Sequence, residues 1–384
     1  MQESKNILIY ANKVARASET FIFFPALAMQ RYTPYYVGSR KGDAFDLPPE
    51  RVFIVNGRGR LARIKQRLTR MFFGHNGTAF LADKLRPLNP RLIQAHFGPE
   101  SINALPLAEK LSIPLIVYYH GFDATATREY AEKSAFLRHY LKQLPMLQEK
   151  ATLVLTQSDF LRQKVIDMGY APEKVRTQYI GVEPTKERAL GYDERKPMVV
   201  FVARLVEKKG ATYLIRAMQK VQASYPELEL VIVGDGVDYD ALYQQAEQEL
   251  QNFRFVGWQS TEEVNQWMKE ALIFSVPSIT AESGDSEGFG MVFIEAQRYG
   301  TPVVSTLHGG IVESVANNQT GILVPEKDSD ALAQAIMKLY SDKALWKTYS
   351  QQAYERANND FNIHHLVAKL ETIYDEICSN WSKS

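Results

Sequence analysis

The sequence predicts an α/β protein built from two doubly wound parallel-sheet domains in tandem. Three observations support this fold class. Short apolar, β-branched runs alternate with helical stretches along the chain, which is typical of parallel sheets covered by helices on both faces. The length of 384 residues exceeds what one hydrophobic core comfortably serves. A polar stretch, residues 181–196, interrupts the alternation near the middle, and we interpret it as the link between the domains.

The predicted strands are short apolar runs, each followed by a polar or glycine-containing turn. They cover residues 6–10, 92–95, 115–119 and 153–156 in the first half, and 198–203, 228–233, 253–256, 272–276 and 302–305 in the second. Two helices, residues 344–357 and 364–377, are predicted near the carboxyl end. The segment between them, residues 358–362, contains Asn and Asp residues that indicate a break.

The two predicted domains differ in charge. The whole chain has a net charge of +1, but residues 1–183 carry +10 and the remainder −9. We expect a first domain over residues 1–183 and a second over 184–361, with residues 362–384 crossing back onto the first. The positive first domain suggests an anionic partner or a membrane surface. Ligands of doubly wound sheets bind at the carboxyl ends of the strands, so we expect a cleft where two such edges face each other.

Composition excludes several classes. The single cysteine, Cys378, leaves no disulfide within the chain and favours a reducing, cytoplasmic compartment. The apolar run at residues 7–10 is too short for a signal peptide, and no run approaches the roughly 20 apolar residues of a membrane span. The seven histidines show no spacing typical of a zinc site, so we expect neither a metal nor a resident cofactor.

Residues 284–295 place two carboxylates, Glu287 and Glu295, on either side of a Gly-x-Gly turn. If a helix begins near Phe289, its first free N–H groups lie between the two acids and form an anion site. The helical rise would separate the carboxylates by roughly 10 Å, enough to hold opposite ends of a nucleotide-sugar. The alternative is a solvated acidic loop followed by an ordinary helix glutamate.

Two cations, Arg204 and Lys209, follow the strand predicted to open the second domain. In a loop at a strand's carboxyl end they could converge on a pyrophosphate, with Arg binding through its planar fork and Lys as a point charge. The alternative is an ordinary pair of surface cations.

Glycines also follow two predicted strands of the second domain. Gly234 and Gly236 come after residues 228–233, and Gly257, with Trp258, comes after residues 253–256. Glycine permits the backbone to approach a base or ribose closely, but it serves equally well as a turn residue.

A histidine, His120, ends a predicted strand of the first domain. A buried, hydrogen-bonded structural histidine is the default interpretation. It becomes a candidate site residue if the cleft places it opposite Glu287.

A basic segment, residues 51–73, carries seven cations and no acid. Its apolar residues fall on one face of a helix, so it could lie on anionic lipid headgroups or pack on its own domain. Nucleic acid is not expected, because interleaved aromatic platforms and the signatures of known readers are missing.

Taken together, these residues resemble the GT-B family of retaining glycosyltransferases called family 4, over nearly the whole chain. The resemblance rests on an ordered set of motifs: His120-Gly121-x-Asp123, Arg204 with Lys209-Gly210, Gly234-x-Gly236, Glu287 with Glu295, and Gly300-x-Pro302-Val303-Val304. Ser18-Glu19-Thr20-Phe21-Ile22, His96-Phe97-Gly98 and Pro277-Ser278 look most like the branch that builds bacterial exopolysaccharides such as colanic acid.

The resemblance implies that two Rossmann-like domains face each other, the second holding a nucleoside-diphosphate sugar and the first presenting the acceptor. It assigns the ribose hydroxyls to Glu295, the sugar hydroxyls to Glu287, and the leaving diphosphate to Arg204 and Lys209, without a divalent metal. His120 would bind the primary hydroxyl of the donor sugar or face the anomeric centre with its backbone. Further donor contacts are expected from Gly234, Gly236, Gly257, Trp258, Gly288, Phe289, Gly290 and Met291, and weaker acceptor contacts from Ser18, Glu19, His96 and Asp123.

One feature departs from many relatives. Residues 12–20 contain no glycine, whereas those relatives carry a glycine-rich loop after the first strand. The resemblance therefore gives no support for a donor-phosphate contact from this loop.

The sequence thus predicts a retaining hexosyltransferase that uses a nucleoside-diphosphate sugar, with uridine as the favoured base, and a glycan or lipid-linked glycan acceptor in bacterial polysaccharide synthesis. We expect it in the cytoplasm, with the basic segment as a candidate contact to the inner membrane face. Two alternatives stay open: a nucleotide-sugar epimerase or sugar-phosphate transferase on the same fold, and a non-catalytic donor-binding or assembly protein.

Overall fold

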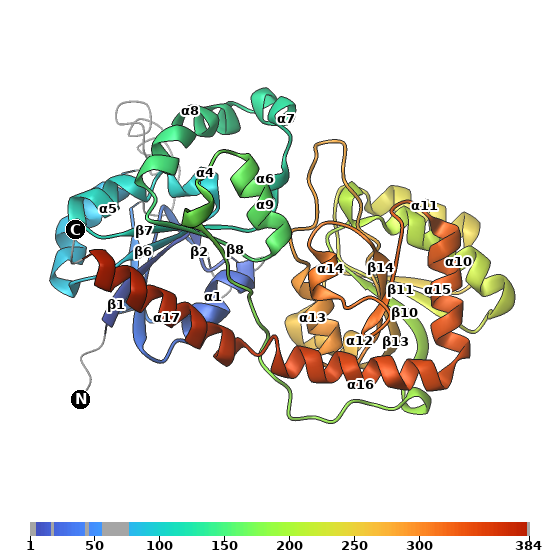
Figure 1. Ribbon diagram of the computed structural model, residues 1–384. Helices are drawn as coiled ribbons and strands as arrows, with labels where there is room; N and C mark the ends of the chain where they lie inside the picture. The colour runs from blue at the N-terminus through green and yellow to red at the C-terminus, as the bar shows by residue number, and fades with distance from the viewer. Residues whose placement is uncertain (1–4, 17–18, 43–45, 56–76, 382–384) are drawn as a thin grey trace. The chain divides into compact units, whose positions relative to one another are not determined.

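The computed structural model describes residues 5–16, 19–42, 46–55 and 77–381. The chain divides into two compact units: the first comprises Met1–Ile180 and Ile363–Ser384, and the second Gly181–Asn362. In each unit a parallel sheet is flanked by helices (Figure 1). The chain therefore leaves the first unit once and returns to it with its last helix.

The first unit is built on a parallel sheet that has seven strands in the described part of the chain, in the order β5-β3-β1-β6-β7-β8-β9. The strands are β1 (Lys5–Tyr10), β3 (Tyr32–Gly38), β5 (Val52–Ile54), β6 (Ile93–His96), β7 (Leu115–Tyr119), β8 (Leu153–Thr156) and β9 (Val175–Thr177), and a short separate pair is formed by β2 (Lys13–Val14) and β4 (Arg40–Lys41). The strand order reverses between β1 and β6, so the carboxyl ends of these two strands form the switch point of the sheet.

Helices cover both faces of this sheet. They are α1 (Thr20–Leu27), α3 (Ala82–Leu85), α4 (Gly98–Ser101), α5 (Leu105–Leu111), α6 (Phe122–Thr125), α7 (Arg128–Lys133), α8 (Ala135–Lys150), α9 (Asp159–Asp167) and α17 (Ile363–Trp381). Strand residues alternate between the faces. Ala95 and Tyr119 belong to the unit's hydrophobic core, whereas His96 and Tyr118 point to the other face and stack on each other. The returning helix α17, red in Figure 1, packs beside α1.

The second unit repeats this architecture with six described strands in the order β12-β11-β10-β13-β14-β15, all parallel. They are β10 (Lys196–Val202), β11 (Glu229–Val233), β12 (Phe253–Gly257), β13 (Ala271–Ser275), β14 (Val303–Thr306) and β15 (Gly321–Val324). The order reverses between β10 and β13. Outside the edge strand β12, where Phe253, Phe255 and Val256 are only partly buried, most apolar residues of these strands are almost fully buried, which explains why their sequences are continuous rather than alternating.

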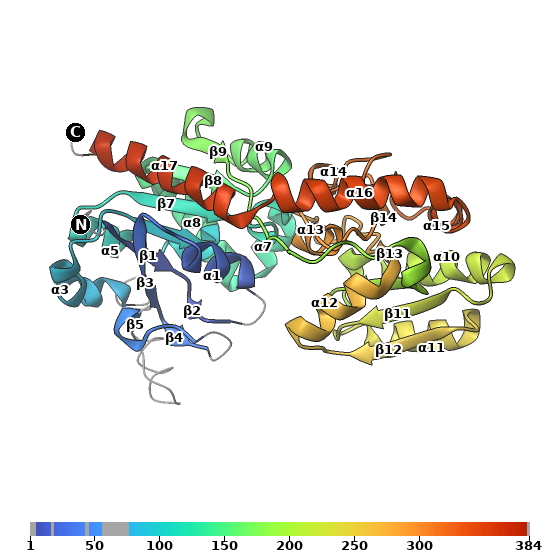
Figure 2. The same ribbon diagram turned by 90° about the horizontal axis from the view of Figure 1, so that it is seen from below.

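The helices of the second unit are α10 (Ala211–Ser224), α11 (Tyr239–Glu249), α12 (Thr261–Glu270), α13 (Met291–Gln297), α14 (Ile311–Ser314), α15 (Ser329–Ser341) and α16 (Lys343–Asn359). Helix α10 packs against α11 and α15, while α13 packs against α12 and α16. Figure 2 shows α10, α11 and α12 around β11 and β12.

The predicted fold class is confirmed, and the predicted strands coincide with observed strands to within a residue or two. The short strands β2, β4, β5, β9 and β15 were not predicted. The longer strand β3 was not predicted either. It contains Pro34, which lacks the N–H that a ladder needs, although Pro34 pairs in register with Ile7. In the part of the chain that the structure describes, no helix is both long and apolar enough to span a bilayer.

Candidate active site

Two of the charged residues predicted in the second unit, Lys209 and Glu287, meet at its switch point, between β10 and β13. The loop after β10 carries Lys208 and Lys209, and the loop after β13 carries Asp285 and Glu287. Lys209 Nζ forms an ion pair with Glu287 Oε2, and the two side chains are only 14% and 12% exposed. Beside it, Lys208 Nζ lies 3.0 Å from Asp285 Oδ1. Two adjacent ion pairs therefore connect the two loops.

Close backbone packing brings these loops together. The N–H of Ile279 donates to the carbonyl of Lys208 at 2.8 Å. Gly210, at a φ of +67°, lies so near Pro277 that a Cβ would stand 1.9 Å from the Pro277 carbonyl oxygen. A side chain at position 210 would push the loops apart, so the glycine after Lys209 is required by packing.

Glu287 is held in its charged form. Burial alone would raise its pKa, but the charges of Lys209 and Lys208 outweigh burial and hold the pKa at about 2. Ser278 Oγ lies 3.5 Å from the same carboxylate oxygen. At neutral pH this carboxylate can accept hydrogen bonds from hydroxyl groups, but it has no proton to donate.

The backbone of Glu287 is anchored by a histidine that sequence reasoning did not select. The N–H of Glu287 donates to His308 Nε2 at 3.2 Å, and the Glu287 carbonyl accepts from the N–H of Gly310 at 2.9 Å. Because Nε2 accepts, Nδ1 carries the hydrogen and donates it to Glu326 Oε1 at 2.7 Å. The signal in the sequence was His308-Gly309-Gly310 shortly after a predicted strand.

Arg204 and Glu295 differ from the paired residues. Both lack a hydrogen bond or ion pair from their side chains to the described residues; Arg204 is exposed and Glu295 is partly exposed. Burial raises the pKa of Glu295, and Arg298 partly offsets this effect. Helix α13 begins at Met291, two residues later than expected, because Gly290 before it has a left-handed φ of +79°.

The turn before α13 is packed from inside. Phe289 is fully buried and its ring lies 5.5 Å from that of Phe361. A Cβ on Gly290 would come within 2.5 Å of the Phe293 ring, and the space at Gly310 is filled by the carbonyl of Gly288. The Gly288-Phe289-Gly290 turn therefore has a packing role of its own, beside the donor contact that the sequence predicts.

The remaining glycines predicted to contact the donor, Gly234, Gly236 and Gly257, differ in their surroundings. A Cβ at Gly234 would lie 1.9 Å from the Ala203 carbonyl oxygen, and one at Gly236 would lie 2.1 Å from that of Leu205. Both glycines thus let the loops after β10 and β11 pack. Gly257 has open space around it and a φ of +69°, and the neighbouring Trp258 is 74% exposed.

In the first unit, His120 and His96 form a buried pair. His120 Nε2 and His96 Nδ1 lie 2.8 Å apart, and Phe21, Phe97 and Tyr118 surround the His120 ring. Burial lowers the pKa of His120 to about 3, against a smaller raising effect of Gln157, and burial also keeps the pKa of His96 well below its usual value. Both rings are therefore neutral at physiological pH.

Asp123 braces the loops around His120. Its carboxylate accepts the N–H groups of Gly98, His120 and Gly121 at 3.0, 3.1 and 2.9 Å. Burial raises its pKa to about 6 even though these donors lower it. With three backbone donors on a buried carboxylate, its position is explained by loop geometry, and acceptor contact by this residue stays a prediction.

The remaining acceptor-side residues lie after β1. Glu19 is buried and pairs with Arg16 at 3.1 Å, and burial raises its pKa. Glu100 Oε2 accepts the N–H of Asn12 at 3.0 Å, which ties this loop to α4 across the switch point of the first sheet. Ser18 and all of the basic segment beyond residue 55 lie outside the described residues.

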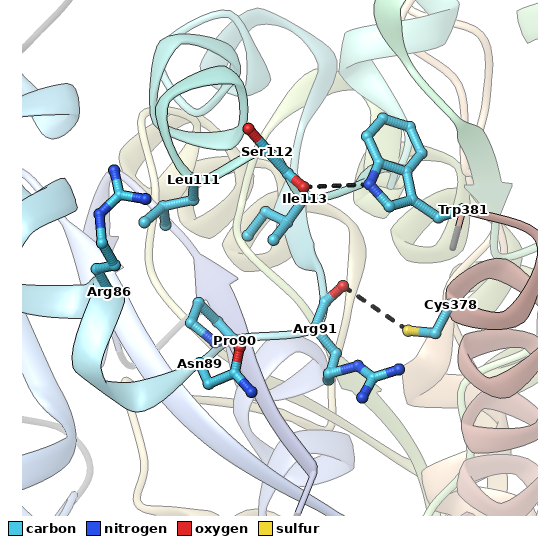
Figure 3. Close-up of a pocket in the computed structure, with 9 residues that line it drawn as sticks. All are labelled: Arg86, Asn89, Pro90, Arg91, Leu111, Ser112, Ile113, Cys378 and Trp381. Atoms are coloured by element: carbon cyan, nitrogen blue, oxygen red, sulfur yellow. Dashed lines mark hydrogen bonds between the residues drawn. The ribbon is translucent and has the colours of Figure 1, made fainter. Parts of the chain in front are cut away.

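A cavity of about 320 Å³ lies elsewhere on the first unit, against the end of α17 (Figure 3). None of the predicted site residues lines it. Two contacts at its edge hold the helix: Trp381 Nε1 donates to the Ser112 carbonyl at 3.1 Å, and Cys378 Sγ lies 3.7 Å from the Arg91 carbonyl oxygen. Within the described ranges, no group of three or more His, Cys, Asp or Glu side chains is arranged to hold a metal ion.

Two doubly wound parallel-sheet units, one with a charged cluster at its switch point, place the protein among two-domain α/β proteins of the GT-B class. The profile described as "Glycosyltransferase Family 4" matches residues 25–186, and that described as "Glycosyl transferases group 1" matches residues 182–356. The chain belongs to glycosyltransferase family 4.

Two curated relatives are glycosyltransferases of bacterial polysaccharide synthesis by name. The putative colanic acid biosynthesis glycosyltransferase WcaL of Salmonella typhimurium is 31% identical over 307 residues, covering 78% of this chain and 74% of the relative. The amylovoran biosynthesis glycosyltransferase AmsK of Erwinia amylovora is 31% identical over 306 residues, with 78% and 73% coverage.

Among solved structures, Anabaena HepE in complex with UDP-glucose superposes with a TM-score of 0.77 at 20% identity, covering 97% of this chain and 99% of HepE. Sucrose-phosphate synthase from Thermosynechococcus elongatus gives a TM-score of 0.75 at 20% identity, covering 98% of this chain and all of the synthase chain. At these identities the superpositions support the GT-B fold and no more.

Proposed function

We propose that the protein is a retaining hexosyltransferase that moves a sugar from a nucleoside-diphosphate sugar to a hydroxyl of a glycan or lipid-linked glycan. The observation that carries the proposal is the charged cluster between β10 and β13, where Glu287 is buried and ionised and Arg204 is left without a carboxylate partner among the described residues. A doubly wound sheet binds ligands at this edge, and an unpaired guanidinium there suits a diphosphate.

The donor is proposed to lie on the second unit. Arg204 would bind the diphosphate, Glu287 would accept hydrogen bonds from sugar hydroxyls, and the unpaired carboxylate of Glu295 would accept from the ribose. Lys209 would keep Glu287 charged and would counter the charge that develops on the leaving group. Uridine is the base that we favour; HepE, which shares the fold at 20% identity, was solved with UDP-glucose.

The acceptor is proposed to be a growing bacterial polysaccharide or its lipid-linked precursor, because the two relatives at 31% identity are named for colanic acid and amylovoran synthesis. The first unit would present this acceptor, with His120 contacting the donor sugar. In the proposed reaction the bond from the anomeric carbon to the diphosphate oxygen breaks, and the bond to the acceptor oxygen forms on the same face. The departing phosphate oxygen takes the acceptor's proton, so no protein base and no divalent metal is required.

Donor identity is the first experiment. Thermal-shift measurements with UDP-, GDP- and ADP-sugars should show stabilisation by one nucleotide class, since a ligand that binds only the folded state raises its unfolding temperature. NMR of the product formed with the matching donor should then show retained anomeric configuration. Inversion of configuration contradicts the retaining mechanism, and activity that a chelator abolishes and magnesium restores contradicts the metal-independent one.

The two alternatives have separate signatures. An epimerase converts the donor without any acceptor, so incubation of donor alone distinguishes it from a transferase. A non-catalytic donor-binding protein would bind the donor without turnover, and a Glu287→Ala variant with turnover equal to wild type would also argue against the proposed site. Membrane attachment through residues 51–73 is tested by flotation with liposomes that contain or lack anionic lipid.

A further inference from the structure

A chain of hydrogen bonds runs from His120 to the returning helix α17. His120 Nε2 contacts His96 Nδ1 at 2.8 Å, and His96 Nε2 contacts Gln94 Nε2 at 3.1 Å. Gln94 Oε1 in turn accepts from the hydroxyl of Tyr374 at 2.7 Å. All four side chains are at least nine-tenths buried. Residues 280 positions apart in the sequence thus share one buried network.

The strand geometry explains how this chain forms. Gln94 and His96 are two positions apart on β6 and therefore point to the same face of the sheet. His96 is in register with Tyr118 on β7, and His120 follows Tyr118 by two positions, so its side chain returns to that face. Helix α17 contributes Tyr374 to the same face.

The donors and acceptors in this chain of hydrogen bonds follow one order, from Tyr374 to His120. The Tyr374 hydroxyl donates to Gln94 Oε1, so the Gln94 amide nitrogen faces His96 Nε2 and donates to it. His96 must then carry its hydrogen on Nδ1, which donates to His120 Nε2. His120 is left with its hydrogen on Nδ1. That atom is buried and makes no hydrogen bond of ordinary geometry to the described residues. The Gln157 side chain, whose Oε1 is also buried without a partner among them, lies close enough to raise the pKa of the ring and offers an acceptor that suits an Nδ1–H group.

A second connection holds the same rings from the same helix. The Tyr118 ring stacks on His96 and His120, with centroids 5.7 and 4.7 Å apart, and its hydroxyl donates to the carbonyl of Gln178. The Gln178 side chain donates to the carbonyl of Leu366 in α17 at 2.9 Å. The orientation of the histidine pair therefore depends on α17 at two points.

We propose that Tyr374 and Gln94 are positioning residues that fix the tautomer of His120 through His96, so that His120 presents an Nδ1–H donor. The value of this donor for catalysis rests on the proposed function, in which His120 contacts the donor sugar, here at its primary hydroxyl. The tautomer itself does not, since it follows from contacts within the first unit. Helix α17 thereby prepares a site residue that lies on a distant part of the sequence.

The first experiment reads the tautomer directly. In protein labelled with ¹⁵N-histidine, long-range proton–nitrogen correlation spectra distinguish Nδ1–H from Nε2–H rings, and the His96→Gln and His120→Gln variants assign the signals. Wild type should show both rings neutral with hydrogen on Nδ1. An Nε2–H tautomer of His120 in wild type overturns the proposal, and no substrate is needed for this result.

Three variants test whether Tyr374 and Gln94 determine the tautomer of His120. Tyr374→Phe frees the Gln94 amide to rotate and should turn the single His120 tautomer into a mixture, and Gln94→Leu, which removes the donor to His96, should do the same. Gln94→Glu can only accept, so at alkaline pH, where nitrogen shifts show both rings neutral, it should move the hydrogen of His120 to Nε2. We call the chain of hydrogen bonds from Tyr374 through Gln94 and His96 to His120 the relay. Unchanged Nδ1–H signals in the variants that fold contradict it.

Trp381→Phe is the matched control, because it removes the Trp381 bond to Ser112 at the other end of α17 and leaves the relay intact (Figure 3). Trp381→Phe should keep the wild-type tautomer of His120.

Turnover assays use the donor identified by thermal shift. The variants of Tyr374 and Gln94 should lose about tenfold in kcat/KM, the value of one well-placed hydrogen bond, while Trp381→Phe should not. With a 6-deoxy donor this difference should vanish. If wild type binds no donor, the proposed function fails while the tautomer result still decides the relay.

Discussion

Lys209 and Glu287 form a nearly buried ion pair that joins the loops after β10 and β13, on the two sides of the switch point. Each residue alone would be a costly, nearly buried charge, so each offsets the cost of burying the other. It also means that the carboxylate proposed to bind sugar hydroxyls and the cation proposed to face the diphosphate are positioned by each other. Changing either residue should therefore affect folding and catalysis together.

The ion pair predicts a pH-dependent contribution to stability. The pKa of Glu287 is about 2 in the folded protein against 4.5 as its ordinary value, so its stabilisation is complete above pH 4.5 and is lost as pH falls through 2. Glu287→Gln should lower the free energy of unfolding by on the order of 3 kcal/mol at neutral pH. The loss should shrink below pH 4.5, as measured by urea unfolding followed by tryptophan fluorescence.

The control for this prediction is an exposed ion pair in the same unit. Asp193 pairs with Lys343 on the surface, where the two side chains are 79% and 61% exposed. Asp193→Asn should change stability by less than about 1 kcal/mol at any pH. An equal effect of the two substitutions would show that the Lys209–Glu287 pair gains nothing from its burial.

Substitutions at Gly234 and Gly257 should distinguish a glycine needed for packing from one that contacts the ligand. Gly234→Ala forces a Cβ to within 1.9 Å of the Ala203 carbonyl oxygen and should destabilise the second unit strongly. Gly257→Ala meets open space and should cost only about 1–2 kcal/mol for its left-handed backbone. If Gly257 approaches the nucleotide base, the same variant should weaken donor affinity measured by calorimetry. Wild-type affinity would remove Gly257 from the donor site.

Much of the fold could be predicted because buried parallel strands leave continuous apolar runs in the sequence. The charged site could be predicted as far as strand ends place residues at one edge, which brought Lys209 and Glu287 together. Sequence reasoning did not select His308, although a His-Gly-Gly run follows a predicted strand there, and it had no signal for Glu326, because the role of both depends on a backbone N–H that only the folded loop presents. The relay from Gln94 to Tyr374 was equally hidden, since periodicity gives the face of a strand but not which distant helix covers it.

Glu100 predicts a stability change of opposite sign to that of Glu287. Burial raises its pKa to about 7, the Asn12 N–H lowers it, and Glu19 raises it further. The folded protein therefore binds a proton that the unfolded chain releases near pH 4.5, and stability from this group falls as pH rises from 4.5 to 7. Glu100→Gln, which can still accept from Asn12, should match wild type at pH 4 and be more stable at pH 8. A variant that is less stable at pH 8 would show that the charged carboxylate is favoured in the fold.

Arg204 predicts a loss of ligand affinity without a loss of stability. Its guanidinium is exposed and makes no hydrogen bond to the described residues, so Arg204→Ala should leave the unfolding temperature unchanged. If it binds the diphosphate, the substitution should weaken UDP binding by roughly 10- to 100-fold, the value of a hydrogen bond to a charged group. Calorimetry at two salt concentrations should also show a weaker salt dependence than in wild type.

Lys347→Ala is the matched control for Arg204, because Lys347 is an exposed cation on α16 of the same unit. It should leave UDP affinity unchanged, since a charge outside the switch point is screened by salt. Arg204→Lys should recover part of the affinity, because an ammonium keeps the charge but loses the planar fork that matches two phosphate oxygens. If Arg204→Ala binds UDP as tightly as Lys347→Ala does, Arg204 has no part in holding the diphosphate, and the cationic role in leaving-group departure falls to Lys209 alone.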